Sequence, residues 1–292
     1  MGILKALFTG SDENPEEEKR TKEDSQFDLF KYDGVRAARI GQLEYAVKCY
    51  ERALELREDL EVREYLARAL VRLGLLEESL EQYQRLAEAE PQNIDVKIQM
   101  AHVAYMLEDY ERMAEWAGQA VELDERHAQA HFVLAQARIG QGDLISGIAQ
   151  LTQAIALDET QGEARLLRGR TLLGMGDVSG AADDADFLLE RLPENEDVLM
   201  LKARVMVAQG KGTEAIPIYS KVIEVNPFHA DAYLERGKLY LEAGDTLLAK
   251  EDADKVLELN PQAMADVSGE YSAEGIEQKV RQAYSNINPF GL

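Results

Sequence analysis

Histidine is the first side chain to consider for catalysis or metal binding, and this chain has four. His127 and His131 stand four residues apart, the spacing that places two imidazoles on one face of a helix in zinc-dependent proteases. No Glu follows His127, and a turn is predicted there, so that arrangement is incomplete. His102 and His229 are distant in sequence. We therefore expect no metal site and interpret these histidines as surface or groove residues.

Other reactive residue types also lack a catalytic arrangement. Cys49 is the only cysteine, which excludes an intramolecular disulfide and fits a reducing compartment. Its position inside a predicted helix suggests packing rather than reactivity. The glycines are single and lie at turns, so a phosphate-binding loop is not expected, and the acidic run Asp183, Asp184 and Asp186 is interpreted as a solvated face. We expect no catalytic activity and no cofactor.

A spacing of 34 residues organises most of the chain. In 230–263, Tyr233, Gly237 and Leu241 recur at helical spacing, Gly244 ends a first helix, and Pro261 stops a second one. The connections are short, so successive helices are expected to be antiparallel. We number places within a repeat from its first residue. Seven repeats fit, at 27–59, 60–93, 94–127, 128–161, 162–195, 196–229 and 230–263.

Two places are occupied by small residues or glycine for a physical reason. Place 8 is small in every repeat because the first helix must approach the second closely there. The residues at place 8 are Gly34, Ala67, Ala101, Ala135, Gly169, Ala203 and Gly237. The turn between the helices carries glycine in six repeats, namely Gly41, Gly74, Gly142, Gly176, Gly210 and Gly244, whereas the third repeat has Glu108.

With these features, 27–263 resembles the tetratricopeptide repeat (TPR) family. The helix-ending proline of that family is present as Pro91, Pro193, Pro227 and Pro261, and the third repeat departs furthest. The resemblance implies an all-α fold, a right-handed α-solenoid of seven helix-turn-helix repeats whose first helices line the concave side. It also implies protein–protein interaction. Family members that grip chaperone C-termini use asparagines on these helices, and because place 9 holds none, that role is not expected here.

The ends of the chain fall outside the repeats. Residues 1–26 are expected to be a flexible acidic tail with a short apolar start, Met1–Phe8, because 9–26 offer too little apolar surface to fold. Residues 264–292 are expected to contain a C-terminal capping helix and a loose end. The apolar start could dock in a concave groove; a membrane-surface anchor is the rival interpretation, which its brevity disfavours.

The candidate binding groove follows from the places that share one face of the first helices. Places 5 and 12 predict an apolar strip in repeats 3 to 7, and place 9 predicts a basic row beside it. The strip comprises Ile98, Phe132, Leu166, Met200, Leu234, Tyr105, Leu173 and Val207, and the basic row Arg170, Arg204 and Lys238. Two alternatives stay open: the apolar groups pack against the next repeat, and the basic groups pair with acids such as Asp197 or Asp231.

Charge narrows the class of partner. The formal net charge of -23 disfavours nucleic acid and anionic membranes and favours basic proteins or peptides. No segment approaches the roughly 20 apolar residues that span a bilayer, and a cytoplasmic location is expected. We therefore expect a non-catalytic scaffold or adaptor that binds a partner's peptide, basic or carrying a terminal carboxylate, in its concave groove. The alternative is a self-associating structural subunit that uses its end repeats or convex face.

Overall fold

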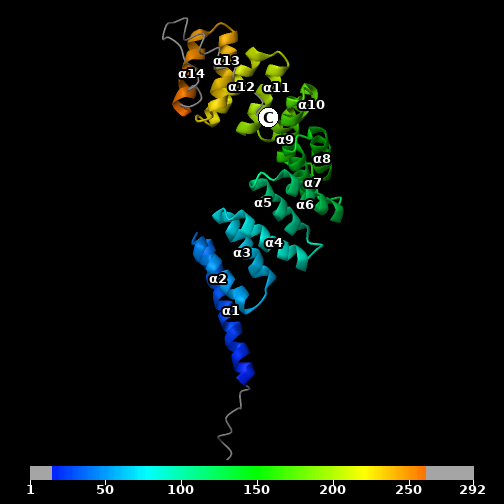
Figure 1. Cartoon of the computed structure of the whole chain (residues 1–292). Helices are drawn as coiled ribbons and strands as arrows, with labels where there is room; N and C mark the ends of the chain where they lie inside the picture. Colours follow the sequence, from blue (N-terminus) through cyan, green and yellow to red (C-terminus); the bar gives the residue numbers. More distant parts are fainter. Residues whose placement is uncertain (1–14, 261–292) are drawn as a thin grey trace, which may run out of the picture. The chain divides into compact units, whose positions relative to one another are not determined.

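The computed structural model describes residues 15–260, which form fourteen helices and no strand. They divide into two compact units, 1–141 and 142–292, and each unit is described by itself. In Figure 1 successive helices of a unit lie side by side in chain order. Unit 1 holds α1 (Pro15–Arg39), α2 (Leu43–Leu56), α3 (Leu60–Leu73), α4 (Leu76–Ala89), α5 (Ile94–Met106), α6 (Tyr110–Leu123) and α7 (Ala128–Gly140). Unit 2 holds α8 (Leu144–Leu157), α9 (Gly162–Gly174), α10 (Val178–Arg191), α11 (Glu196–Ala208), α12 (Gly212–Val225), α13 (Ala230–Glu242) and α14 (Thr246–Leu259).

The helices match the predicted repeats, two per repeat. In unit 1, α1 packs on α2, α3 on α4 and α5 on α6; in unit 2, α9 packs on α10, α11 on α12 and α13 on α14. Each second helix also packs on the first helix of the following repeat, as α2 does on α3 and α10 on α11. The predicted all-α architecture of stacked helix pairs is therefore confirmed. The fourth repeat contains α7 and α8, and the division between the units falls between them.

Local backbone chemistry explains where the helices begin and end. All six predicted turn glycines have φ between 76° and 86°, the left-handed region that glycine adopts without strain. Glu108 takes their place in the third repeat with φ of 57°. Polar side chains cap the helix starts: Asp59, Asn93 and Asp177, for example, each accept a hydrogen bond from a backbone N–H three residues on.

The expected close approach at place 8 is also confirmed. A Cβ added to Gly34 would lie 2.5 Å from the ring of Tyr50 on α2. One added to Gly169 would lie 2.8 Å from Leu201 and 3.2 Å from Asp184. At this place the backbone of the first helix thus packs against side chains of the second helix and, at Gly169, of the next repeat as well.

The first helix differs from its expected length. α1 begins at Pro15, so residues 15–26 are helical and the expectation of a flexible tail is wrong for them. Their sequence is polar, and side chains such as Asp24 and Gln26 are exposed, which is why apolar periodicity gave no signal there. The apolar start Met1–Phe8 and the capping helix expected within 264–292 lie outside the described residues.

Candidate functional site

The apolar strip is placed on the first helices as expected, but half of it is not accessible. Met200 is 2% exposed, Ile98 4%, Leu173 5% and Phe132 7%. Met200 belongs to the core cluster around Tyr219, and Ile98 to the one around Trp116. These four side chains stabilise the repeats, so the expectation that they contact a ligand is wrong. The alternative, packing within the protein, describes them.

The remaining members of the strip are partly or fully accessible. Leu166 and Leu234 are half-buried, and each packs against a neighbouring core cluster. Tyr105 is 48% exposed and Val207 39%. Leu173 and Val207 illustrate why place alone is a poor guide, because both stand at place 12 and only Val207 is exposed.

Two of the three residues of the basic row form ion pairs with the next repeat. The Arg170 guanidinium donates a hydrogen bond to the Asp197 carboxylate, the pair anticipated from sequence. The Arg204 guanidinium donates to Glu235 at 2.6 Å, and the Tyr219 hydroxyl donates to the same carboxylate at 2.6 Å. Burial lowers the pKa of Arg204, but Glu235 outweighs it and the net shift is upward. No ion pair joins Lys238 to another residue of 15–260.

Unit 1 contains a cleft that sequence analysis did not predict. It lies among α3, α4 and α5, has a volume of about 520 Å³, and we call it the acidic cleft. Buried Tyr83, Leu86 and Val96 supply its apolar surface. Its charged lining is Glu61, Glu64, Arg68, Glu90 and Asp95, completed by Leu60, Asn93 and Gln99.

Four carboxylates and one guanidinium line this cleft and give it a net negative charge. Arg68 pairs with Glu64 at 2.5 Å, and Asn93 donates a hydrogen bond to Glu90 at 2.7 Å. Among the described residues no cation pairs with Asp95. A long side chain with an apolar stem and a cationic head matches this lining.

A second cleft, of about 330 Å³, lies among α1, α2 and α3 and shares Arg68 with the first. We call it the tyrosine cleft because Tyr50 and Tyr65 line it, their ring centroids 5.8 Å apart. Burial raises the pKa of Tyr50 to about 12. Its other lining residues are Val35, Ala38 and Ala69, which are apolar, and Arg39 and Arg72, which are basic.

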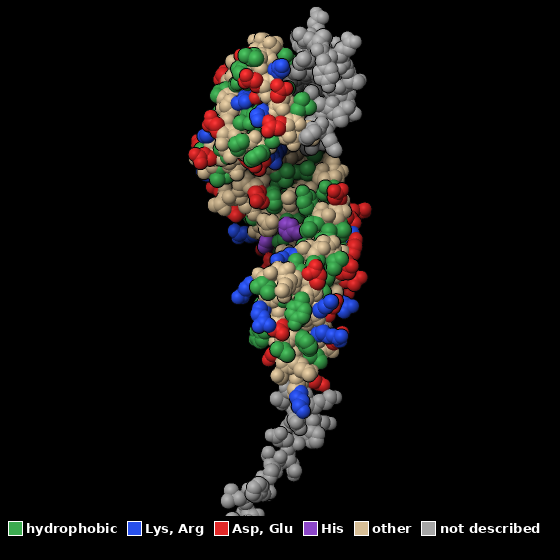
Figure 2. All heavy atoms as spheres, turned by 90° about the vertical axis from the view of Figure 1, so that its left-hand side faces the viewer, with side chains coloured by type: hydrophobic (Ala, Val, Ile, Leu, Met, Phe, Trp, Pro, Cys, Tyr) green, Lys and Arg blue, Asp and Glu red, His purple; other side chains and the backbone are tan. Residues whose placement is uncertain are grey.

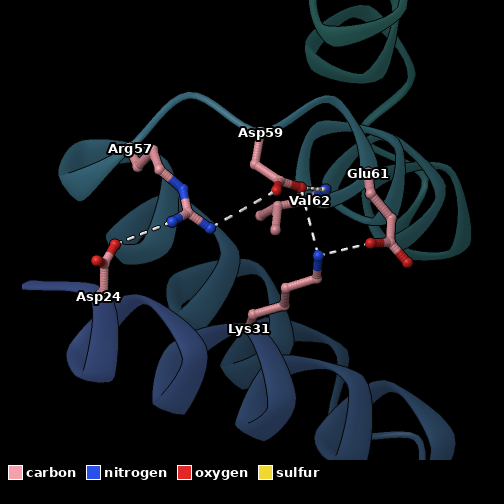
Figure 3. Close-up of polar contacts among 6 residues, drawn as sticks. All are labelled: Asp24, Lys31, Arg57, Asp59, Glu61 and Val62. Atoms are coloured by element: carbon pink, nitrogen blue, oxygen red, sulfur yellow. Dashed lines mark hydrogen bonds and ion pairs between the residues drawn. The ribbon is translucent and has the colours of Figure 1, made fainter. Parts of the chain in front are cut away.

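A network of ion pairs fixes α1 against α3 beside these clefts (Figure 3). Lys31 donates to Glu61 at 2.5 Å and to Asp59 at 3.5 Å, and Asp59 also caps α3 through the Val62 N–H. Arg57 reaches Asp24 at 3.0 Å. Burial lowers the pKa of Lys31, but the two carboxylates outweigh it and raise it. The hydrogen bond from Lys31 lowers the pKa of Glu61, so the carboxylate stays charged at the edge of the acidic cleft.

The sequence showed that the first helices become more polar near these clefts, although it did not locate the clefts themselves. Place 5, apolar in repeats 3 to 7, is Lys31 and Glu64 in the first two repeats. That change marks where the face of the first helices becomes polar. On the face drawn in Figure 2, hydrophobic side chains are interspersed with acidic and basic ones.

His127, His131 and Cys49 have positions in which they cap a helix or pack inside the protein. His127 caps α7 by accepting the Ala130 N–H, and His131 is buried with Nε2 2.9 Å from the Glu125 carbonyl oxygen, so His131 is not a surface or groove residue. Among residues 15–260 no group of three acidic, histidine or cysteine side chains is placed to hold a metal ion. Cys49 is buried, which raises the pKa of its thiol, in agreement with the expected packing role.

One acidic residue was misinterpreted. Asp184 is 1% exposed and accepts two hydrogen bonds from Arg168, at 2.8 and 2.6 Å, so it is not part of a solvated face. Arg236 and Asp252 repeat the arrangement in the seventh repeat, at 2.9 and 2.6 Å. Both arginines also reach a hydroxyl on the preceding second helix, Thr152 and Ser220 respectively. The spacing of sixteen residues between Arg and Asp was a usable signal.

Comparison with known proteins agrees with this architecture. The sequence model of the tetratricopeptide repeat family matches residues 34–94, 166–224 and 200–263, together more than half of the chain. The chain belongs to the TPR family. No curated protein matches it in sequence. A TPR fold of this kind indicates a protein–protein interaction scaffold.

Solved structures similar to this TPR protein share its fold at low sequence identity. A TPR protein from Parabacteroides merdae has a TM-score of 0.67 and 17% identity, covering 89% of this chain and 99% of its own. PilW, a widely conserved type IV pilus biogenesis factor, has a TM-score of 0.63 and 18% identity, covering 76% and 98%. YrrB, a TPR protein described as having an unusual peptide-binding site, has a TM-score of 0.52 and 19% identity, covering 62% and 93%.

Proposed function

We propose that this TPR protein is a non-catalytic scaffold that binds a peptide segment of a partner in the two clefts of unit 1. The observation that carries the proposal is the shared wall of the clefts, where Arg68 lines both. An extended segment that crosses Arg68 places successive side chains in one cleft and then in the other. The groove expected along repeats 3 to 7 is a weaker candidate, because Ile98, Phe132, Leu173 and Met200 are buried.

The lining of the clefts favours a segment of mixed character. The acidic cleft suits a Lys or Arg whose stem lies on Leu86 and Val96 and whose head approaches Asp95. The tyrosine cleft, with three guanidiniums around an apolar floor, suits an apolar or aromatic residue followed by a carboxylate. Affinity is expected to be about micromolar, because a linear peptide loses much conformational freedom on binding.

A selection experiment tests the proposal without knowledge of the natural partner. The full chain is used to select binders from a displayed library of random peptides, and recovered peptides are measured by fluorescence anisotropy. We expect Glu64→Lys combined with Asp95→Lys to weaken binding about tenfold or more, as loss of a charge-paired hot spot does. Glu81→Lys, an exposed change on α4, is the matched control and should leave affinity unchanged. Selected peptides that bind the double variant as well as the wild type would exclude these clefts.

Location is a separate part of the proposal. Each helix in the described part of the chain, 15–260, is too short or too polar to span a bilayer. With Cys49 free and buried, we propose a cytoplasmic protein. Fractionation of the native cell, with the protein appearing in the membrane or the external fraction, would overturn this.

A further inference from the structure

The first helix carries exposed apolar side chains on one face that the described residues of unit 1 leave uncovered. Leu29 is 58% exposed and Tyr32 67%, and the side chain of Arg36 is 77% exposed. These residues follow i, i+3, i+7 spacing and therefore lie on one face of α1. They stand at places 3, 6 and 10 of the first repeat.

In the following repeats the same face is buried. At places 3 and 10, α3 has Val62 and Ala69, which are 0% and 3% exposed, and α11 has Val198 and Val205, which are 1% and 0% exposed. The preceding second helix packs on each of these first helices, α2 on α3 and α10 on α11. The open face of α1 thus corresponds to the face that the preceding helix covers in later repeats. None of the described helices covers it in the first repeat.

We propose that residues 1–8 of the same chain cover this face. The segment brings the apolar side chains Ile3, Leu4, Leu7 and Phe8. Apolar side chains of α2 share a core cluster with Val62 and Ala69, and those of α10 share one with Val205. This docking place differs from the concave groove considered above and is independent of the two clefts.

The length of the connecting chain fits the proposal. From Pro15 to Leu29, α1 rises about 21 Å at 1.5 Å per residue. Residues 9–14 span at most about 20 Å when extended. Residue 8 can therefore reach Leu29, and residues 1–8 are long enough to continue from there past Tyr32 to Arg36.

A second copy of the chain is a less favourable occupant. Each copy carries a formal charge of -23, so two copies repel each other, whereas Met1–Phe8 includes one lysine and no acid. The short connection also keeps the segment at an effective concentration of about millimolar next to α1. Intramolecular docking therefore outcompetes association at ordinary protein concentrations.

Cysteine cross-linking of the full chain tests the proposal. In a Cys49→Ala background, Leu7→Cys with Tyr32→Cys is treated with a short bismaleimide, and Leu7→Cys with Lys48→Cys is the matched control, since Lys48 is exposed on α2. We expect an intramolecular cross-link to Tyr32→Cys, independent of protein concentration, and its loss when Leu4→Glu and Phe8→Glu are added. Circular dichroism checks that each variant keeps its helices.

Three results would overturn the proposal. Cross-linked dimers that increase with concentration would show that a second copy covers the face. Equal cross-linking to Tyr32→Cys and Lys48→Cys would show that residues 1–8 have no fixed place on α1. Absence of both cross-links would show that the segment lies elsewhere.

Discussion

Glu108 is a non-glycine residue held in the left-handed region, with φ of 57°. It occupies the turn place that glycine fills in the other repeats, and a side chain there costs of order 1 kcal/mol or more. We expect Glu108→Gly to raise the free energy of unfolding by about 1 kcal/mol, measured by urea denaturation. Gly74→Ala at the equivalent turn, with φ of 76°, should lower it. A neutral or destabilising Glu108→Gly would mean that the side chain makes a stabilising interaction that outweighs the strain.

Gly34 and Gly118 make a matched pair for the close approach of helices. A Cβ on Gly34 would meet the Tyr50 ring at 2.5 Å, whereas one on Gly118 in α6 would meet nothing within 4 Å. We expect Gly34→Ala to destabilise by about 1–3 kcal/mol through overpacking, and Gly118→Ala to stabilise by roughly 0.5–1 kcal/mol through helix propensity. Thermal and urea unfolding measure both. The same sign for both changes would contradict the packing argument.

Tyr50, in the tyrosine cleft, makes the stability of the folded protein depend on pH. Burial raises its pKa from 10.0 to about 12, so the folded protein holds the phenolic proton more tightly than the unfolded chain does. Stability from this group is fully present below pH 10 and is lost as pH rises from 10 toward 12. Because other tyrosines titrate in the same range, the measurement is the difference in urea stability between wild type and Tyr50→Phe across this window. We expect the variant to lose less stability than the wild type; parallel curves would refute the assignment.

At the scale of elements, buried arginine–aspartate pairs hold the helices of single repeats together. Arg236 on α13 donates two hydrogen bonds to Asp252 on α14, and Asp252 is 3% exposed. We expect Asp252→Ala to destabilise by about 1.5–3 kcal/mol, because the partly buried Arg236 guanidinium loses its carboxylate and keeps only its hydrogen bond to Ser220. Asp254→Ala, an exposed change on the same helix, is the control and should stay within about 0.5 kcal/mol of the wild type. Equal effects of the two changes would show that the pair is energetically unimportant.

The same elements show what could be predicted from sequence. Turn glycines and place 8 were predictable because each depends mainly on the backbone of the turn or helix that carries it, as Gly34 beneath Tyr50 shows. Exposure at places 5 and 12 was not, because it depends on which side chains of the next helix pack there. Met200 at place 5 is 2% exposed, whereas Val207 at place 12 of the same helix is 39% exposed. The clefts depend on three helices at once, so spacing within one helix could not locate them.

At the scale of the whole molecule, acidic residues outnumber basic ones, and the repulsion among them destabilises the folded state. The chain has 55 Asp and Glu against 32 Lys and Arg. Exposed ion pairs such as Arg52–Glu55 contribute at most about 1 kcal/mol each and are screened by salt. Enclosed pairs such as Arg236–Asp252 are screened much less. The main effect of salt should therefore be to reduce repulsion among the unpaired acids.

We accordingly expect the urea midpoint to rise with salt. Between about 0.01 M and about 1 M NaCl the Debye length falls from roughly 30 Å to roughly 3 Å, which screens repulsion between neighbouring helices. A variant with Glu81→Gln, Glu88→Gln and Glu122→Gln, all exposed positions on α4 and α6, carries less repulsion. It should be more stable than the wild type at low salt and converge with it at high salt. A midpoint that falls with salt would mean that the ion pairs between repeats, such as Arg170–Asp197, outweigh the net charge in holding the array together.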